Sequence, residues 1–256
     1  MAISLDDIKH GGDMKPPRIL LYGVEGVGKT TFAACAPAPI FIRTEDGLGE
    51  LDVPAFPLAT SYADVMGALT VLATEDHPYS TVVIDSVDWL EPLVWNHVAQ
   101  PNNWKSIEDP GYGKGYIEAD EPWHDYVSAL NYLRDTKGMT VIQLAHNEVK
   151  TYNDPEREPY DRHMVKLHKR ASAMLRENCD YLLFANYRVG TTKDGKGFNE
   201  TTRAIGSGER ILCTQERPAY MAKRRTNMPD EIPMDWNAFA QHIRYYNQSQ
   251  NETEAA

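Results

Sequence analysis

A glycine-rich loop near the amino terminus carries the residue types that bind phosphate. Gly23, Gly28, Lys29 and Thr30 follow the spacing Gly-x-x-x-x-Gly-Lys-Thr, directly after the apolar run Ile19–Tyr22. Glycines let backbone N–H groups converge on phosphate oxygens, and a helix starting near Lys29 adds the positive end of its dipole. A lysine here reaches β- and γ-phosphates, and a threonine hydroxyl is a hard oxygen ligand for Mg²⁺. The sequence therefore predicts a nucleoside-triphosphate site.

We assign the whole phosphate-binding loop to nucleotide contact. Its predicted contact residues are Gly23, Val24, Glu25, Gly26, Val27, Gly28, Lys29, Thr30 and Thr31. The expected cofactors are ATP and Mg²⁺. The loop itself does not distinguish ATP from other triphosphates, because it contacts phosphates and not the base.

Two carboxylates stand at the ends of further apolar runs. Asp85 closes Thr81–Asp85, a β-branched run typical of a strand covered on both faces, and would join Thr30 as a Mg²⁺ ligand. A helix N-cap is the alternative role for Asp85. Glu45 follows a second such run and is predicted to polarise the water that attacks the γ-phosphate. Asp46 competes for that role, and a loop carboxylate without a role is the other alternative.

His146 follows a fourth apolar run, which spans residues 140–145. Its ring could donate a hydrogen bond to a γ-phosphate oxygen and report the nucleotide state to the residues that follow. The alternative is a surface or core histidine with no such role. With Lys29 and Glu45, His146 completes the catalytic group that we predict for a single chain.

Apolar runs alternate with helix-like segments along most of the chain, which predicts an α/β fold. The expected helices span residues 62–74, 87–98, 123–136, 165–177 and 236–246. We predict a mostly parallel twisted sheet with helices on both faces and antiparallel strands at its C-terminal edge. In such sheets ligands collect at the carboxyl ends of the strands. Gly23, Glu45, Asp85 and His146 should therefore meet at one edge.

The predicted boundaries leave a single large domain. Residues 1–17 are expected to form a flexible arm, 18–246 the nucleotide-binding domain and 247–256 a disordered tail. Residues 147–163, charged and proline-containing, are predicted to form a mobile loop. Asp194-Gly-Lys-Gly197 is typical of a hairpin turn.

Charge is distributed unevenly over a chain whose net charge is −11. Residues 150–225 carry 16 basic against 10 acidic side chains, whereas residues 1–149 carry 9 against 22. A basic third favours a nucleic-acid contact, and an uneven solvated surface is the alternative. No apolar run approaches a membrane span, and the three cysteines are scattered. We therefore expect a cytoplasmic location and no membrane partner.

Three segments together resemble the RecA-like recombinase core in order and spacing. They are Phe41–Glu45, Val83–Val87 and Val141–His146. That family has a glutamate after the first, an Asp-Ser-Val Walker B motif in the second and a polar sensor ending the third, where glutamine is common. More narrowly, residues 16–245 resemble phage-encoded RecA-like P-loop proteins, some of which act as single-strand annealing ATPases.

The resemblance implies a homo-oligomer with nucleotide at its subunit interfaces, and single-stranded DNA as a partner, with single-strand binding protein as a further one. Lys223-Arg224-Arg225 resembles the Lys-x-Arg element whose two cations reach a neighbouring subunit's γ-phosphate, so Lys223 and Arg225 are predicted to be catalytic in trans. A basic surface triplet is the alternative. The predicted DNA contact is the segment after the sensor, with its cations Lys150, Arg157, Arg162, Lys166, Lys169 and Arg170.

These features predict a Mg²⁺-dependent RecA-like ATPase that acts on single-stranded DNA in phage recombination or replication. One alternative is a nucleotide-gated DNA-binding or loader protein with little turnover. Another is a P-loop kinase, which the acids interspersed in residues 147–163 disfavour.

Overall fold

The computed structural model describes residues 14–194 and 201–247 of the 256. The strands within these residues are β1 (Arg18–Gly23), β2 (Pro39–Arg43), β3 (Thr81–Asp85), β4 (Thr140–Tyr152), β5 (Tyr160–Val165), β6 (Tyr181–Asp194), β7 (Thr201–Cys213) and β8 (Glu231–Pro233). The helices are α1 (Lys29–Ala34), α2 (Tyr62–Thr74), α3 (Val87–Ala99), α4 (Lys114–Glu118), α5 (Asp120–Lys137), α6 (Lys169–Asn178) and α7 (Trp236–Ala240).

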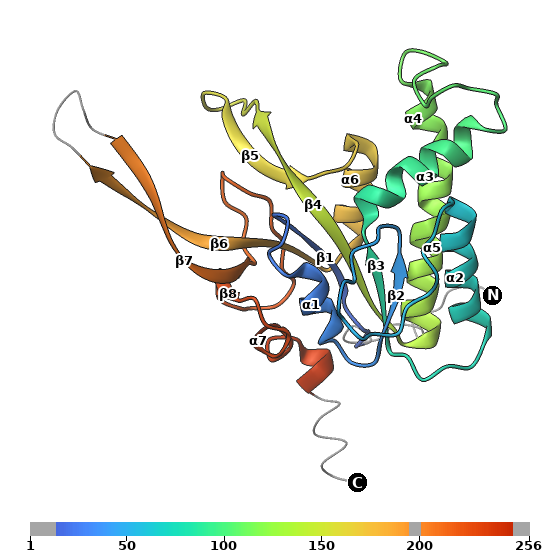
Figure 1. Ribbon diagram of the computed structural model, residues 1–256, viewed down its shortest axis with the longest axis horizontal. Coiled ribbons are helices and arrows are strands. Elements are labelled where there is room, and N and C mark those ends of the chain that lie inside the picture. Colours follow the sequence, from blue (N-terminus) through green and yellow to red (C-terminus); the bar gives the residue numbers. More distant parts are fainter. Residues whose placement is uncertain (1–13, 195–200, 248–256) are drawn as a thin grey trace, which may run out of the picture.

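The strands form one mixed sheet in the order β2-β3-β4-β1-β6-β7-β8, with β5 paired to the outer part of β4 (Figure 1). The five strands β2, β3, β4, β1 and β6 run parallel to one another, and β7 and β8 add antiparallel strands at one edge. Connections between parallel strands need crossovers, which the helices supply. The predicted α/β sheet with an antiparallel C-terminal edge is confirmed.

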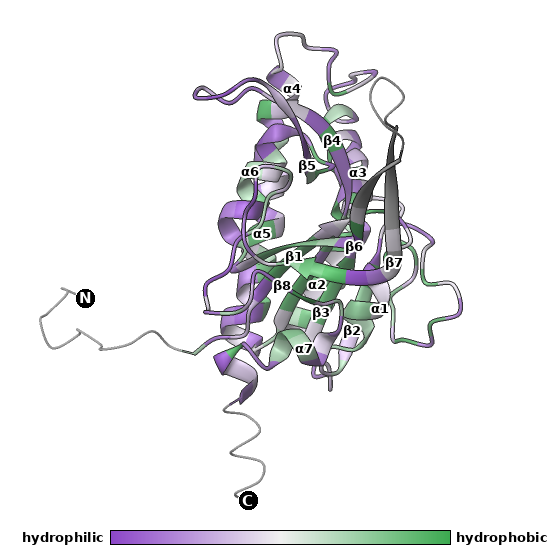
Figure 2. Cartoon of the chain, turned by 90° about the vertical axis from the view of Figure 1, so that its left-hand side faces the viewer, coloured by the Kyte–Doolittle hydropathy of each residue, from purple (hydrophilic) through white to green (hydrophobic). Residues whose placement is uncertain are grey.

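Helices cover both faces of the sheet because alternate residues of each buried strand point to opposite sides. Leu20 and Tyr22 of β1 pack in the cluster formed with α2, α3, α5 and α6. Ile19 and Leu21 pack in the other, with α1 and α7. In Figure 2 the hydrophobic colouring concentrates on the central strands, whereas the outer β4–β5 hairpin is hydrophilic.

The strand register fixes which carboxyl ends lie side by side. Gly23 at the end of β1 pairs with His146 of β4, and Arg43 at the end of β2 pairs with Asp85 at the end of β3. Because β4 lies between β1 and β3, it brings His146 between the phosphate-binding loop and Asp85. The carboxyl ends of these strands together form one rim of the sheet.

The prediction of a mobile loop over residues 147–163 was wrong. β4 continues to Tyr152 and turns back as β5, so most of this segment is an antiparallel hairpin in which Tyr152 pairs with Tyr160. Antiparallel pairing satisfies the backbone while leaving charged side chains in solvent, which is why the polar composition was misleading. Arg162 anchors the hairpin, because its guanidinium contacts the Glu216 carboxylate and the Tyr220 carbonyl.

Other predicted boundaries differ in detail. β6 and β7 form a hairpin, and its predicted turn at residues 194–197 falls mostly outside the described residues. The expected helix over residues 236–246 is interrupted after Ala240. Residues 1–13 and 248–256, which make up most of the predicted arm and tail, also lie outside the described residues. In the portion that is described, no helix has the length and apolar character that a membrane crossing requires.

Candidate nucleotide-binding site

The phosphate-binding loop connects β1 to α1 with a backbone that requires glycine at three positions. Gly26 and Gly28 have φ values of 69° and 97°, a region that residues with a Cβ rarely occupy. A Cβ on Gly23 would lie 2.1 Å from the Ala185 carbonyl oxygen of the neighbouring β6. The glycines therefore allow both the turn and the close approach of the two strands.

Lys29 is the first residue of α1, and its side chain folds back over the phosphate-binding loop. Its Nζ donates hydrogen bonds to the carbonyl oxygens of Gly23 at 3.1 Å and Val24 at 3.0 Å. Burial lowers the pKa of Lys29, and the nearby carboxylates, led by Asp88 and Asp85, oppose this shift. The ammonium group is therefore held by neutral acceptors that a phosphate oxygen can replace.

Thr30 and Asp85 present two adjoining hard oxygen ligands. The Thr30 hydroxyl donates to Asp85 Oδ2 at 2.8 Å, and Asp85 is only 5% exposed. Burial raises the pKa of Asp85, whereas the Thr30 hydrogen bond and Lys29 favour its charged form. A hydroxyl and a carboxylate in this arrangement fit a Mg²⁺ ion that retains water ligands.

The Asp85–Ser86 peptide is cis, and it lies beside the end of β2. Thr44 connects the two segments, because its hydroxyl accepts from Ser86 N at 2.9 Å and donates to Ser86 O at 2.6 Å. This contact fixes the backbone between Asp85 and the start of α3, and on the β2 side it fixes the residue next to Glu45.

A cavity of about 630 Å³ opens over the phosphate-binding loop. Its lining residues are Glu25, Gly26, Gly28, Lys29, Thr30, Thr31, Glu45, Gly47, Leu48, Leu51, Asp85, Trp89, His146 and Lys166. Five side chains predicted for chemistry therefore surround one cavity. Glu45 is half-buried there, and burial raises its pKa, although His146 partly offsets this.

Asp88, which the sequence analysis missed, orients His146. Its carboxylate accepts from His146 N at 3.0 Å and bonds His146 Nδ1 at 2.8 Å. The hydrogen bond from Asp88 raises the pKa of His146 and so favours the charged form of the imidazole ring. Because Asp88 bonds Nδ1, it leaves the other ring nitrogen, Nε2, for a different partner. Asp88 comes three residues after Asp85, but a carboxylate in a first helical turn is common and gave no signal of this contact.

Two further residues outside the predicted set contact the loop from the β6–β7 hairpin. The Tyr187 hydroxyl donates to Gly26 O at 3.3 Å, and Arg210 Nη1 donates to Val27 O at 3.4 Å. Tyr187 and Arg210 are direct cross-strand partners. No local motif marks either residue, since both act through contacts about 160 or more positions away in the sequence.

Lys223 and Arg225 lie away from the cavity of their own chain. Lys223 Nζ donates to Arg176 O at 2.6 Å, and Arg225 Nε bonds Asp180 Oδ1 at 3.0 Å. Asp180 is hydrogen-bonded to Arg18 at the start of β1, which is the opposite end of the strand from Gly23. The structure therefore gathers Lys29, Thr30, Glu45, Asp85 and His146, and it leaves Lys223 and Arg225 at the other edge.

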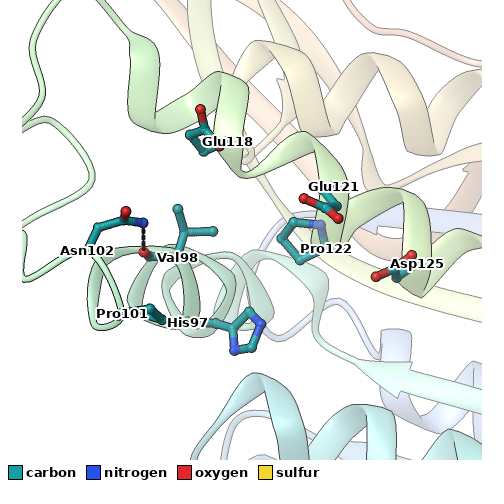
Figure 3. A pocket seen from close by; sticks show the side chains of 8 residues that line it. All are labelled: His97, Val98, Pro101, Asn102, Glu118, Glu121, Pro122 and Asp125. Atoms are coloured by element: carbon teal, nitrogen blue, oxygen red, sulfur yellow. Dashed lines mark hydrogen bonds between the residues drawn. The ribbon is translucent and has the colours of Figure 1, made fainter.

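A separate cavity of about 290 Å³ lies beside the end of α3 and the start of α5 (Figure 3). Its side chains include Glu118, Glu121 and Asp125, and it shares no lining residue with the cavity over the loop. Carboxylate walls repel phosphate, so this cavity does not compete as a nucleotide site. Among the described residues, no group of acidic, histidine or cysteine side chains is arranged to hold a metal ion on its own.

Comparison with known proteins yields two findings. A family model described as "AAA domain" matches residues 15–226. The SPbeta prophage-derived uncharacterized protein YorG of Bacillus subtilis (strain 168) is 24% identical over 226 residues, which cover 86% of this chain. The match covers 62% of that relative, so this chain corresponds to less than two thirds of its length.

Proposed function

The chain belongs to the AAA domain family of P-loop nucleotide-binding proteins, and from this premise we propose that it is a Mg²⁺-dependent ATPase that acts on single-stranded DNA. One observation carries the proposal. Lys29, Thr30, Asp85, Glu45 and His146, from four separate parts of the chain, line a single cavity over the phosphate-binding loop. A cation, two metal-binding oxygens, a base and a proton donor are the parts that ATP hydrolysis requires.

The loop side of the cavity supplies binding. Lys29 would exchange its two carbonyl acceptors for phosphate oxygens, and Thr30 and Asp85 would hold Mg²⁺. Bound Mg²⁺ supplies positive charge that offsets the negative charge of the phosphates. The Thr30 hydroxyl and the Asp85 carboxylate fit this ion, because both offer oxygen ligands and the two groups are already in contact.

The opposite side supplies the groups for hydrolysis. Glu45 accepts a proton from a water molecule as the water oxygen attacks the γ-phosphorus, and the bond to the β–γ bridging oxygen breaks with its electrons remaining on ADP. The products are ADP and inorganic phosphate. The raised pKa of Glu45 makes it a stronger base. His146, oriented by Asp88, donates a hydrogen bond to a γ-phosphate oxygen.

Four observations support the narrower assignment to a RecA-like ATPase of phage origin. The three sequence segments carry the resemblance, and the position of β4 between β1 and β3 is what a sensor at His146 needs. The similarity to a prophage-derived protein supports the origin. Lys223 and Arg225, which lie far from the cavity of their own chain, could reach phosphate only in a neighbouring subunit.

The β4–β5 hairpin is the proposed contact for single-stranded DNA. It projects from the body of the sheet and begins directly after His146 (Figure 1). Tyr152 and Tyr160 have ring centroids 5.6 Å apart on paired strands, and the Arg162 guanidinium lies 5.4 Å from the Tyr152 ring. Aromatic faces stack with bases, and the exposed cations of the hairpin, Lys150 and Arg157, are the groups available to contact the DNA backbone, whereas the buried Arg162 holds the Tyr152 side of the hairpin. Binding through such cations should weaken steeply as salt increases.

The test is ATP hydrolysis with and without single-stranded DNA, on the unaltered protein and on Glu45→Gln. We expect DNA to stimulate turnover, and Glu45→Gln to retain ATP affinity while losing turnover by about 10³-fold. Asp46→Asn is the matched control, because the Asp46 side chain is 86% exposed, and it should keep full activity. Equal activity of the Glu45→Gln variant would exclude Glu45 as the base.

A nucleotide-gated loader is the second candidate. One observation favours it. Lys223, which is predicted to act in hydrolysis, donates its Nζ hydrogen bond to the Arg176 carbonyl of its own chain. Tight ATP binding without turnover at every DNA length would support this candidate over the ATPase.

A further inference from the structure

Lys166 is one of the residues that line the nucleotide cavity. It directly follows Val165, the last residue of β5, and it lines the cavity together with Glu45 and His146. Its side chain is exposed. It is the second lysine of the cavity lining after Lys29, and its backbone is hydrogen-bonded to that of His146.

The backbone around Lys166 is held at several points. Lys166 N donates to His146 O at 3.0 Å, and Leu167 N donates to Val165 O at 2.8 Å. The Leu167 side chain is buried. His168 N then donates to both carboxylate oxygens of Glu91, at 2.9 and 3.0 Å. The ammonium group of Lys166 is therefore free to move, but its point of attachment is fixed beside the cavity.

Lys166 has no carboxylate partner in the described structure, unlike three of the basic residues near it in the sequence. Lys150 lies 2.6 Å from Glu148, and Arg162 and Arg170 are paired with Glu216 and Asp120. Within the part of the chain that the structure describes, Lys166 has no ion pair and its side chain makes no hydrogen bond. An unpaired ammonium group beside a phosphate cavity is available to an anionic ligand at little cost.

We propose that Lys166 contacts the γ-phosphate of ATP and makes the site selective for ATP over ADP. The inference rests on the proposed function, since it assumes that a triphosphate occupies this cavity. The loop glycines and Lys29 would bind the phosphates on the side of the cavity formed by the phosphate-binding loop. The terminal phosphate would then extend toward Glu45 and His146. Lys166 stands on that side, where ADP has no phosphate to contact.

The test compares the affinities of a non-hydrolysable ATP analogue and of ADP by titration calorimetry, in the absence of DNA. Lys166→Ala should weaken the analogue about tenfold, the scale of one hydrogen bond to a charged group, and leave ADP within about twofold. Lys166→Arg should recover most of the lost affinity. Lys105→Ala, at an exposed loop lysine outside the cavity, is the control and should change neither value.

Two outcomes would separate this inference from the proposed function. If the unaltered protein binds the analogue but Lys166→Ala leaves the ratio of the two affinities unchanged, the role of Lys166 is overturned and the nucleotide site stands. If the unaltered protein binds neither nucleotide, both are overturned. Should Lys166→Ala lower the thermal midpoint appreciably, Lys166→Gln provides the same comparison with a longer side chain.

Discussion

The two edges of the parallel sheet both gather charged side chains, but they use them differently. At the carboxyl edge, Lys29 is held by carbonyl oxygens and Lys166 has no ionic partner among the described residues. At the amino edge, Asp180 accepts from the Arg18 backbone and guanidinium and from Arg225, and Arg134 lies 3.7 Å away. The two lysines of the carboxyl edge have no ion pair among the described residues, whereas the arginines around Asp180 at the amino edge do.

The direction of the pKa shifts of three carboxylates separates the two edges as well. Arginine neighbours, Arg18 foremost, hold the pKa of Asp180 below its ordinary range in spite of burial. At the other edge, burial raises the pKa of both Glu45 and Asp85. A charged group whose ion-pair partners are all present stabilises the fold. A charged group that lacks such partners is available to bind a ligand. Incomplete pairing, more than the number of charges, therefore marks the functional edge.

Arg225 offers the largest test of this comparison, because it lies at the paired edge and is also predicted to act in trans. Arg225→Ala should reduce ATP hydrolysis about 10³-fold without changing nucleotide affinity, as expected for a cation supplied by a neighbouring subunit. The side chain is 61% exposed, so the free energy of unfolding should change by less than about 1 kcal/mol. Steady-state kinetics and denaturant unfolding measure the two effects.

Arg217→Ala is the matched control for this experiment. Arg217 is a similarly exposed arginine, paired with Asp230 at 2.5 Å, and we assign it no role in catalysis. Unchanged turnover in the Arg225→Ala variant would remove Arg225 from the trans role and leave the amino edge purely structural.

Asp180→Ala should produce the next largest effect, this time on stability. Removing this buried carboxylate leaves arginines unpaired, and the free energy of unfolding should fall by about 3 kcal/mol. Asp135→Ala on the same edge, where the carboxylate is 42% exposed, should cost only about 0.5 kcal/mol. Nucleotide affinity should be unchanged in both. A cost for Asp180→Ala no larger than that of its control would contradict the structural assignment.

Glu91→Gln tests the carboxyl edge of the sheet, with a smaller effect on the free energy of unfolding that depends on pH. Burial raises the pKa of Glu91 to about 7, so the folded protein binds more protons than the unfolded chain from the ordinary carboxyl range up to that pH. Stability must then decrease as pH rises through this window. The neutral glutamine keeps an acceptor for His168 N and should gain about 2 kcal/mol over the unaltered protein near pH 8.

The gain should disappear near pH 4, where the Glu91 carboxyl is protonated in the folded protein. Thermal unfolding at both pH values measures the difference, and Glu118→Gln, at an exposed position in α4, should show no such dependence. A gain of equal size at both pH values would show that burial of the charge is not the cause.

The parts of this molecule that could be predicted from sequence are those with local causes. The strands ending at Gly23 and Asp85 are short apolar runs covered on both faces, and the loop between Gly23 and Lys29 has a spacing that its backbone requires. The alternation of strands and helices then implies that their carboxyl ends share a rim. For this reason Glu45 and His146 could be expected near the loop before any coordinates were known.

The parts that could not be predicted depend on contacts between distant residues. Asp88 and His146 are 58 positions apart, and Arg210 contacts Val27 across 183 positions. The β4–β5 hairpin was missed because its stability comes from pairing and from Arg162, and neither leaves an apolar pattern. Residues that position others are harder to find than those that carry the chemistry, since their types are common everywhere on a protein surface.

The length of β4 has a mechanical consequence. This one strand of 13 residues is paired in the parallel sheet as far as His146 and continues to Tyr152 in the hairpin, with no glycine or proline between. One part of β4 therefore lies at the nucleotide cavity through His146, and its far end at Tyr152 lies about 20 Å beyond, so the strand could move as a stiff lever. Under the proposed function, a slight tilt of β4 that follows loss of the terminal phosphate would be magnified at Tyr152 and would displace the single-stranded DNA proposed to bind at the hairpin.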